Sequence, residues 1–446
     1  MRGSNVAVVG AGYVGLTTAA CLTSLGHRVV CADVGQKKVD MLRRGEATIQ
    51  EPGIAALIAE GLVSGRLEFV LGARAAVAEA GTVFLCVPTP MSAGGAADLR
   101  ALEAVVTELR DVLSPGCVVV NKSTVPVGTA VRVGELLDRA DVSVVSNPEF
   151  LREGSAVYDF LNPNRIVIGA AGHDLAGAER VAGLYEKIDA PVLVTDSASS
   201  EMIKYASNCY LATRLSFVNT IAELCEYLDA DIDDVTTGMG YDERIGNSFL
   251  RPGPGWGGSC LPKDTVALLR TAESVGSEFP VLRAAIDANQ RHQELVVDKV
   301  RKAVGGDLAG ARIGLLGLTF KAGTDDLRDS PALAIAKLLA AEGADLAGYD
   351  PSVRGPVAGV TGQVRIVGTA YHAAHGAAAI VVLTEWPEFR ALDWPRMAVR
   401  LGGRSVIDTR NHLDPLVLDR AGLSYQGIGR PVSRDGSRKP LPPLAA

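Results

Sequence analysis

The stretch that decides the fold is NVAVVGAGYVGLTTAACLTSLGHRVVCADV, residues 5–34. It contains an apolar run at 6–9, closely spaced glycines, a helical pattern and a second apolar run at 28–32 that leads to Asp33. This order predicts a strand, a glycine turn, a helix and a second, parallel strand. The chain is therefore predicted to begin with a Rossmann-like unit.

The glycine turn of this unit has the spacing GxGxxG. Gly10 permits the tight turn, Gly12 lets the backbone approach a pyrophosphate, and Gly15 allows close packing of the helix on the strand. Asp33 stands where a carboxylate binds the ribose hydroxyls of NAD and repels the additional phosphate of NADP. We therefore predict an NAD site, and a glycine turn with a purely structural role is the alternative.

Further strands and helices extend this pattern. Apolar runs of strand length that end in polar or turn residues lie at residues 82–90, 117–128, 142–150, 165–170 and 191–196. Strands that alternate with helices predict an α/β fold with a doubly wound parallel sheet. We assign residues 1–198 to an N-terminal NAD-binding Rossmann-like domain.

A long helical pattern follows, from Ser199 to Leu228, without proline or glycine. Its apolar residues recur at helical spacing, and its length exceeds what one small domain needs. The pattern predicts a long central helix that joins two domains and offers a dimer surface, within a helical dimerisation domain of residues 199–304. An ordinary buried core helix is the alternative.

The opening pattern returns at Ala311. Residues 311–351 again predict strand, glycine turn, loop, helix and strand, and two more strands are predicted within 378–386 and 404–411. We assign residues 305–430 to a second Rossmann-like domain with a doubly wound parallel sheet. It lacks the close glycine trio, so it is not expected to bind a second dinucleotide in the same way. Residues 431–446 are polar and proline-rich and are predicted to be disordered.

Composition argues against several classes of function. The chain of 446 residues carries a formal net charge of −7, which disfavours a nucleic-acid surface. No apolar run predicts a signal peptide or a membrane span, so we expect a cytoplasmic protein. The seven cysteines are odd in number and irregular in spacing, which argues against a disulfide framework and a zinc site. No metal is expected, and every cysteine except Cys260 is interpreted as a small core residue.

Cys260 lies in the glycine- and proline-rich stretch RPGPGWGGSCLPKD, residues 251–264. A helix is predicted to begin just after it, and a helix N-terminus together with Lys263 would stabilise a thiolate. Glycines at 255, 257 and 258 would leave room for a substrate. Beside an NAD site, a nucleophilic cysteine suggests oxidation of an alcohol to an aldehyde and then, through a thioester, to an acid. A structural cysteine in a glycine turn is the alternative.

Two further groups carry candidate chemistry. Lys204 and Asn208 are one helical turn apart in EMIKYASN, so they share a face on which they could polarise a hydroxyl or hold an oxyanion. Lys321 follows a predicted strand end, where α/β sheets bind ligands such as a phosphate or a sugar. A solvated lysine is the alternative at both positions.

The chain carries, in this order, the motifs GAGYVG, VPTP, KSTVPVGT, NPEFLREGSA, EMIKYASNCYLATRLSFVNTIAELC, GWGGSCLPKD, GLTFKAGTDDLRDSPA and LTEWPEF. Over about residues 5–430 the sequence thereby resembles the UDP-glucose/GDP-mannose dehydrogenase family. The resemblance implies an N-terminal NAD domain, a long dimer helix and a C-terminal UDP-sugar domain. It also implies that the C6 alcohol of a UDP-sugar is oxidised to a carboxylate with two NAD⁺, through a thiohemiacetal and a thioester on Cys260. The motifs favour UDP-glucose as substrate and UDP-glucuronate as product.

The resemblance further implies roles for individual residues. The catalytic residues are Cys260 as nucleophile, Lys204 and Asn208 for oxyanions, Asp264 and Thr124 for water, and Glu149 for proton transfer or thioester hydrolysis. The residues implied for NAD are Gly10, Gly12, Tyr13, Val14, Gly15, Asp33, Thr89, Thr124, Glu153, Lys263 and Arg328. Those implied for the UDP-sugar are Glu149, Phe150, Leu151, Glu153, Lys204, Asn208, Phe249, Arg251, Gly257, Phe320, Lys321 and Arg410. Arg244 would reach the substrate of the partner subunit in a homodimer.

Other interpretations share part of this pattern. GDP-mannose 6-dehydrogenase has the same Cys, Lys and NAD motifs but is disfavoured by LTEWPEF and GWGGSC. UDP-N-acetylmannosamine dehydrogenases typically have GGHC where this chain has GGSC. A two-electron β-hydroxyacid dehydrogenase would not need Cys260 or the second Rossmann-like domain. A non-catalytic NAD-sensing or scaffold protein would not need Cys260, Lys204 and Asp264 together.

Overall fold

The structure, a computed structural model, describes residues 3–92, 94–172 and 174–431. The chain divides into two compact units, Met1–Tyr210 with Lys263–Phe279, and Leu211–Pro262 with Pro280–Ala446. The segment 432–446 of the predicted disordered tail lies outside the described residues. The division into three domains and a tail stays a prediction.

The first unit contains an eight-stranded sheet in the order β3-β2-β1-β4-β5-β6-β7-β8. Parallel pairing places the end of β1 beside the end of β2, with Val9 opposite Ala32, so the glycine turn and Asp33 meet at one edge of the sheet. The strands are β1 Asn5–Val9, β2 Arg28–Asp33, β3 Leu67–Leu71, β4 Thr82–Leu85, β5 Val118–Asn121, β6 Ser143–Ser146, β7 Ile166–Ala170 and β8 Val192–Thr195.

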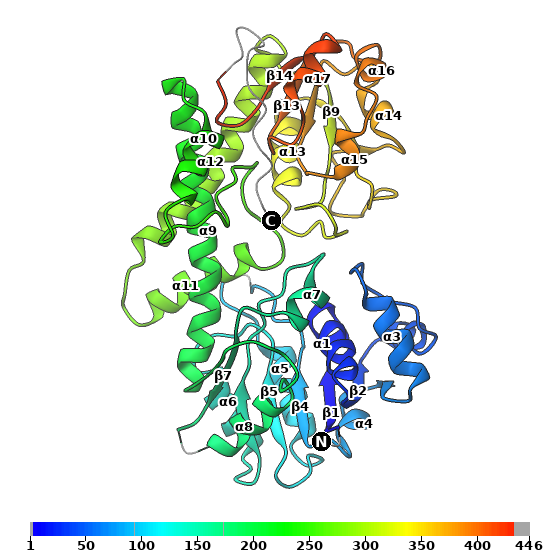
Figure 1. The fold of residues 1–446 in the computed structure, drawn as a ribbon, viewed down its shortest axis with the longest axis vertical. Coiled ribbons are helices and arrows are strands. Elements are labelled where there is room, and N and C mark those ends of the chain that lie inside the picture. Colours follow the sequence, from blue (N-terminus) through cyan, green and yellow to red (C-terminus); the bar gives the residue numbers. More distant parts are fainter. Residues whose placement is uncertain (1–2, 93, 173, 432–446) are drawn as a thin grey trace. The chain divides into compact units, whose positions relative to one another are not determined.

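Helices cover both faces of this sheet (Figure 1). One core holds side chains of α1 (Tyr13–Ser24), α2 (Gln36–Arg43), α3 (Ile54–Val63), α7 (Ala156–Leu161) and α8 (Leu175–Gly183). The other holds side chains of α4 (Ala73–Val77), α5 (Arg100–Leu109) and α6 (Thr129–Leu137). Along β5, Val118 and Val120 face the first core and Val119 the second, the alternation expected of a strand buried on both faces.

One junction departs from the predicted parallel sheet. β6 and β7 pair antiparallel, with Val145 opposite Ala170. The connection between them holds only the short helix α7 and returns the chain from the edge at which β6 ends. An antiparallel neighbour needs no crossover to the opposite edge of the sheet. The segment that carries Glu149 and Glu153 therefore stays at the carboxyl edge of the strands.

The predicted long helix is confirmed as α9, Ser197–Leu228, which begins two residues before the predicted start. The boundary between the two units falls inside this helix, after Tyr210. In the second unit, Val218, Ala222 and Cys225 of α9 share a core with α10 (Ile232–Gly240) and α12 (Pro280–Ala303). Helix α11, Leu261–Ser274, also crosses a unit boundary, after Pro262.

The second unit contains a six-stranded parallel sheet in the order β11-β10-β9-β12-β13-β14. Its strands are β9 Arg312–Leu316, β10 Asp345–Tyr349, β11 Arg365–Ile366, β12 Ala379–Val382, β13 Ser405–Asp408 and β14 Ser424–Gln426. Its remaining helices are α13 Pro331–Ala341, α14 Ala370–Ala374, α15 Pro387–Arg390, α16 Trp394–Ala398 and α17 Pro415–Arg420. The predicted second Rossmann-like domain is confirmed. The edge strands β11 and β14 were not predicted, because they are too short to show an apolar pattern.

Within residues 3–92, 94–172 and 174–431, no helix has the length and apolar character needed to span a bilayer. Across these same ranges, no three side chains of His, Cys, Asp or Glu are grouped so as to hold a metal ion. The expected location in the cytoplasm stays a prediction.

Candidate active site

The glycine turn after β1 has a different requirement at each glycine. Gly10 has φ +102°, and a Cβ there would lie 2.6 Å from the carbonyl oxygen of Cys86. A Cβ on Gly15 would lie 1.7 Å from the carbonyl oxygen of Gly10, so the close helix–strand packing requires glycine. A Cβ on Gly12 would meet no atom within 4 Å, which leaves the start of α1 open to a phosphate.

Asp33 is held at the end of β2 by three donors. Its Oδ2 accepts hydrogen bonds from the Ala11 N–H and the Lys38 ammonium, both at 3.0 Å, and its Oδ1 accepts one from the Gly35 N–H at 2.9 Å. Burial would raise the pKa of Asp33, but these three hydrogen bonds and the charge of Lys38 hold it below its ordinary value. The carboxylate is therefore ionised at neutral pH and faces the glycine turn.

Replacing Asp33 with alanine should reduce the preference for NAD⁺ over NADP⁺. The change removes the carboxylate that repels a 2′-phosphate and frees the ammonium of Lys38, 3.0 Å away, to bind that phosphate. We expect the ratio of kcat/KM values for the two cofactors to fall by at least about tenfold, the effect of a single charged contact. The exposed Asp307→Ala is the control, and an unchanged ratio in Asp33→Ala would contradict the role of this carboxylate.

The loops after β4 and β5 are tied together next to this turn. The Thr89 hydroxyl donates to the carbonyl oxygen of Thr124 at 2.8 Å. At the start of α6, the carboxylate of Glu201 from α9 accepts hydrogen bonds from the N–H groups of Gly128 (2.7 Å) and Ala130 (2.8 Å). Burial raises the pKa of Glu201 to about 7, although these backbone groups oppose the shift. Glu201 thereby links the segment that carries Thr124 to the helix that carries Lys204.

Lys204 forms a buried ion pair with Glu149. Its Nζ lies 3.1 Å from Oε1 of Glu149 and donates to the carbonyl oxygen of the same residue at 2.7 Å. The second carboxylate oxygen accepts from the Leu151 N–H at 2.7 Å. Burial would raise the pKa of Glu149, but the charge of Lys204, the Leu151 N–H and the charge of Lys122 hold it below its ordinary value. At neutral pH, Glu149 is a carboxylate that can accept a proton.

Asn208, one turn along α9, contacts a second buried carboxylate. Its Nδ2 donates to Oδ2 of Asp264 at 2.6 Å, and the Lys263 ammonium donates to Oδ1 at 2.6 Å. The side chain of Asp264 is fully buried, so both oxygens have partners where water is excluded. The positive charge of Lys263, predicted to favour a thiolate at Cys260, is thus offset by Asp264.

The segment after β6 is also bonded to the glycine turn. The Tyr13 hydroxyl donates to the buried carboxylate of Glu51 and accepts from the Gly154 N–H at 2.8 Å. The same N–H group donates to Glu51 at 2.8 Å. Val14, Leu151 and Glu153 are half-buried along these two segments.

Two cations lie over the ring of Phe150. The guanidinium of Arg165 stacks 3.6 Å from the ring centroid and the ammonium of Lys204 lies 5.3 Å from it. Cations over the negative face of an aromatic ring restrict the ring's orientation by cation–π attraction. Phe150 is thus fixed beside the Lys204–Glu149 pair.

In the second unit, Cys260 ends the loop that leads into α11. It is half-buried, whereas the other six cysteines are buried as interpreted from the sequence. The glycines before it face protein atoms: a Cβ on Gly257 would lie 2.0 Å from the Asp329 carbonyl oxygen, and one on Gly258 would lie 2.8 Å from the Phe320 ring. Glycine is therefore required here for packing of the loop, a reason that differs from the predicted room for a substrate.

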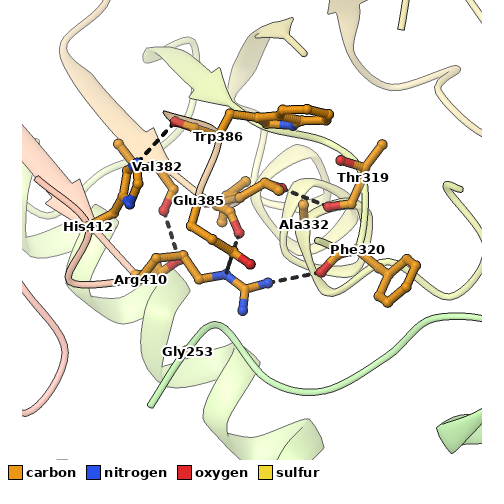
Figure 2. Close-up of polar contacts among 12 residues, drawn as sticks. Gly253, Thr319, Phe320, Ala332, Val382, Glu385, Trp386, Arg410 and His412 are labelled. Carbon is orange, nitrogen blue, oxygen red and sulfur yellow. Dashed lines mark hydrogen bonds and ion pairs between the residues drawn. The ribbon is translucent and has the colours of Figure 1, made fainter. Parts of the chain in front are cut away.

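Arg410 lies where three neighbouring strands of the second sheet end (Figure 2). Its Nε donates to the Leu383 carbonyl oxygen at 3.0 Å and lies 3.0 Å from Oε2 of Glu385, and its Nη2 donates to the Phe320 carbonyl oxygen at 2.9 Å. A Cβ on Gly253 would lie 3.1 Å from Nη1. The guanidinium is thus fixed at the carboxyl edge of the sheet, where α/β domains bind ligands.

The remaining predicted residues of the second unit lie nearer the surface. Lys321 has its ammonium 5.5 Å from the Phe320 ring centroid. Arg328 and Arg244 are exposed and form ion pairs of 2.6 Å with Asp326 and Asp242. The predicted contacts Phe249 and Arg251 are also exposed, and Phe249 has a left-handed backbone with φ +58°.

Asp350 directly follows β10, the second strand of the opening unit in the second sheet, whereas Asp33 is the last residue of β2 in the first. Its Oδ2 accepts from the N–H groups of Leu318 (2.7 Å) and Thr319 (3.0 Å) and from the indole N–H of Trp386 (3.1 Å). The residue is 1% exposed. Its carboxylate therefore stabilises the loops of the same domain that carry Leu318, Thr319 and Trp386.

Family models of UDP-glucose/GDP-mannose dehydrogenases match three consecutive parts of the chain. The NAD binding domain matches residues 4–189, the central domain 198–291 and the UDP binding domain 314–415. The chain belongs to the UDP-glucose/GDP-mannose dehydrogenase family. NAD is its cofactor, and the glycine turn and Asp33 lie within the family's NAD binding domain.

Individual members of the family are similar to the chain over nearly its whole length. A UDP-glucose 6-dehydrogenase of Rhizobium meliloti (strain 1021) is 42% identical over 434 residues, 96% of this chain and 99% of that protein. The structure of a UDP-glucose dehydrogenase from Pyrobaculum islandicum has a TM-score of 0.87 at 37% identity, covering 96% of this chain and 98% of that one. A UDP-D-ManNAc dehydrogenase from Pyrococcus horikoshii has a TM-score of 0.85 at 28% identity, covering 95% and 99%.

Several polar residues of this dehydrogenase were missed by sequence reasoning. Glu51, Arg165, Glu201 and Glu385 each contact a predicted site residue or its segment. Glu385 lies inside LTEWPEF, a motif noted without a role for its acid. Glu201 also lies inside a motif, whereas Glu51 and Arg165 lie outside the motifs, and no sequence signal pointed to these two because their partners are distant along the chain.

Proposed function

We propose that this dehydrogenase oxidises the C6 alcohol of UDP-glucose to the carboxylate of UDP-glucuronate, with two NAD⁺ consumed per sugar. Relatives named for UDP-glucose, at 37% and 42% identity over nearly the full chain, support this substrate. The match to the family's UDP binding domain supports the nucleotide. The observation that carries the proposal is the half-buried Cys260 directly before α11, four residues ahead of the buried Asp264.

The first oxidation requires a base and a stabilised oxygen. NAD⁺, when bound at the glycine turn, accepts a hydride in each oxidation. As the C6 carbon loses its hydride, the alcohol loses its proton, directly or through water, to the ionised carboxylate of Glu149. The ammonium of Lys204 and the amide of Asn208 stabilise the negative charge that develops on the substrate oxygen. The product of this step is an aldehyde.

The second oxidation proceeds on the cysteine. The thiolate of Cys260 adds to the aldehyde carbon and forms a thiohemiacetal, whose oxygen Lys204 and Asn208 stabilise. Loss of the second hydride from this carbon leaves a thioester. Water, oriented by Asp264 and Thr124, attacks the thioester carbon; the C–S bond breaks, Cys260 leaves as thiolate and the carboxylate is released. After the proton of the first step has passed to solvent, Glu149 is again ionised and is suited to take a proton of this water.

Counting NADH per sugar nucleotide tests the reaction. The proposal predicts two NADH from each UDP-glucose, a two-electron dehydrogenase would yield one, and a non-catalytic NAD-sensing or scaffold protein would yield none. The same assay with dTDP-glucose, GDP-mannose and UDP-N-acetylmannosamine, each with NAD⁺ and NADP⁺, tests the substrate. A higher kcat/KM for GDP-mannose than for UDP-glucose would contradict the assignment.

We also propose that the protein acts as a homodimer. Tyr210, Phe217 and Leu224 recur every seven residues along one side of α9, with side chains 62%, 52% and 48% exposed, and Tyr227 and Leu228 extend this surface. An exposed row of large apolar residues on a long helix fits a partner helix. Arg244 follows α10 with its side chain 89% exposed, which suits a contact with the partner's substrate.

Replacing Arg244 with alanine should raise the KM for UDP-glucose with little change in the NAD⁺ KM or in thermal stability. The exposed ion pair with Asp242 contributes little to folding, whereas a guanidinium bound to a phosphate contributes about 1.5–3 kcal/mol. Steady-state kinetics on the dimer isolated by size-exclusion chromatography with light scattering measures this. A fully active monomer, or an unchanged KM in Arg244→Ala beside the control Arg354→Ala, would contradict the shared site.

A further inference from the structure

The loop before Cys260 is held by buried polar side chains of two helices. Within the second unit, residues 251–258 lie against α9 and α12, and four side chains of these helices bond the loop or its tryptophan. They are Ser216, Asn219, Asn289 and His292, all less than 9% exposed. None of them carries chemistry in the proposed mechanism.

Asn289 pairs with the backbone of Trp256 in both directions. Its Oδ1 accepts from the Trp256 N–H at 2.8 Å, and its Nδ2 donates to the Trp256 carbonyl oxygen at 3.0 Å. A Cβ on the preceding Gly255, which has φ +112°, would lie 2.8 Å from the same Oδ1. The indole N–H of Trp256 donates to the Ser216 hydroxyl at 2.8 Å. Both the main chain and the side chain of Trp256 are thereby fixed, four residues before Cys260.

His292 and Asn219 hold Gly253 in the same manner. The ring Nε2 of His292 donates to the Gly253 carbonyl oxygen at 2.7 Å, and Oδ1 of Asn219 accepts from the Gly253 N–H at 2.9 Å. Nδ1 of His292 is buried without a hydrogen-bond partner among the described residues, so a proton there would lack an acceptor. Burial lowers the pKa of His292 to about 4. The ring is therefore neutral at neutral pH, with its single proton directed at the loop.

The hydrogen bonds to residues 251–258 restrict a segment whose glycines would otherwise have large conformational freedom. Gly253, Gly255, Gly257 and Gly258 lie within six residues of one another, and glycine loses more backbone entropy on ordering than any other residue. The Gly258 N–H donates to the Asp329 carbonyl oxygen at 3.2 Å, which fixes the end of the loop nearest Cys260. With the bonds of Asn289 and His292, the loop is anchored along its length.

We propose that Asn289 and His292 are positioning residues for Cys260: by anchoring the loop at Trp256 and Gly253, they hold the thiol in the orientation needed to attack a C6 aldehyde. Neither residue touches the reacting atoms; both act through the backbone. This proposal rests on Cys260 being the nucleophile. A displacement of the reacting atom by about 1 Å through a distant change can cost on the order of 10²-fold in rate.

The test compares His292→Leu with His292→Gln in the full-length enzyme. Leucine occupies the space of the imidazole but cannot donate a hydrogen bond, so it leaves the Gly253 carbonyl oxygen buried and unpaired. The Nε2 of glutamine can donate to this oxygen. We expect kcat to fall by about 10- to 100-fold in His292→Leu, the KM for NAD⁺ to be nearly unchanged, and His292→Gln to recover most of the loss. His375→Leu, at an exposed histidine, is the matched control.

A second measurement reports on the thiol itself. Iodoacetamide modification of Cys260, followed by mass spectrometry of its peptide, should be several-fold faster in His292→Leu and Asn289→Leu, because a loosened loop exposes the half-buried sulfur more often. Equal modification rates, with kcat unchanged per folded enzyme and only the Tm lowered, would overturn the positioning role. If Cys260→Ala stayed active, the proposed mechanism would fail, while the modification rates would still decide whether these residues position the loop.

Discussion

Cys260→Ala is expected to lose the ability to form two NADH per UDP-glucose, with kcat for the complete reaction reduced by on the order of 10³-fold or more, as for nucleophiles of other covalent enzymes. Without the sulfur, the aldehyde has no covalent route to a thioester, so at most the first, reversible hydride transfer remains. Cys260→Ser should bind NAD⁺ and UDP-glucose nearly as before but fail to turn over, because an alkoxide forms much less readily than a thiolate. Binding by calorimetry and NADH formation by absorbance separate these two effects.

The covalent intermediate itself can be observed. A variant slowed in hydrolysis, such as Glu149→Gln, should accumulate a sugar-nucleotide adduct on the peptide that carries Cys260, detectable by intact-mass and peptide mass spectrometry. Cys225→Ala removes a buried thiol outside the mechanism and should retain activity. If Cys260→Ala makes two NADH at near the parent rate, the mechanism proposed here is wrong.

Lys204→Met is expected to reduce kcat by about 10²- to 10³-fold, the cost of removing one donor to a developing oxyanion. It should also destabilise the protein by about 3–5 kcal/mol, because removing one partner of a buried ion pair leaves the other charge uncompensated. The pair is nearly inaccessible, with side chains 5% and 6% exposed for Lys204 and Glu149. Lys302→Met, at an exposed lysine, is the control, and equal stability and activity of both variants would contradict the role of the pair.

In Lys204→Met, the contribution of Glu149 to the pH dependence of stability should change sign. In the parent, the pKa of Glu149 is below its ordinary value, so the stabilisation by its carboxylate is present above pH 4.5 and is lost as the pH falls through the lowered pKa. Without the ammonium, burial raises this pKa, and ionisation then costs stability as the pH rises. Thermal unfolding at pH 5 and pH 8 should show a smaller deficit of Lys204→Met at pH 5.

The sequence alone predicted the elements whose signals are local. The glycine turn, Asp33 and the long helix each depend on residues within one or two elements, and the structure contains all three. A short apolar run does not indicate whether its strand pairs parallel or antiparallel with its neighbour. The antiparallel pairing of β7 was therefore not predicted. The run RIVIGA fits either orientation.

The supporting residues of the candidate site could not be predicted in this way. Glu201 bonds the N–H of Ala130, 71 positions earlier, and His292 bonds Gly253, 39 positions earlier. A polar residue on a helix is usually solvated, and only the folded chain shows which backbone group it meets. The sequence also could not show that the glycines near Cys260 pack against Asp329 and Phe320, because these residues lie far along the chain.

The contrast between Asp33 and Asp350 bears on how this architecture could have diverged from two similar halves. Both halves keep an acid at the same topological position, but in the second half the acid is saturated by two backbone amides and the indole of Trp386. Dinucleotide binding at this acid would require removal of the indole, exposure of the acid and a new glycine trio, and removal of the indole alone would leave the buried carboxylate with one donor fewer. Specialisation of the two halves is therefore difficult to reverse by single substitutions.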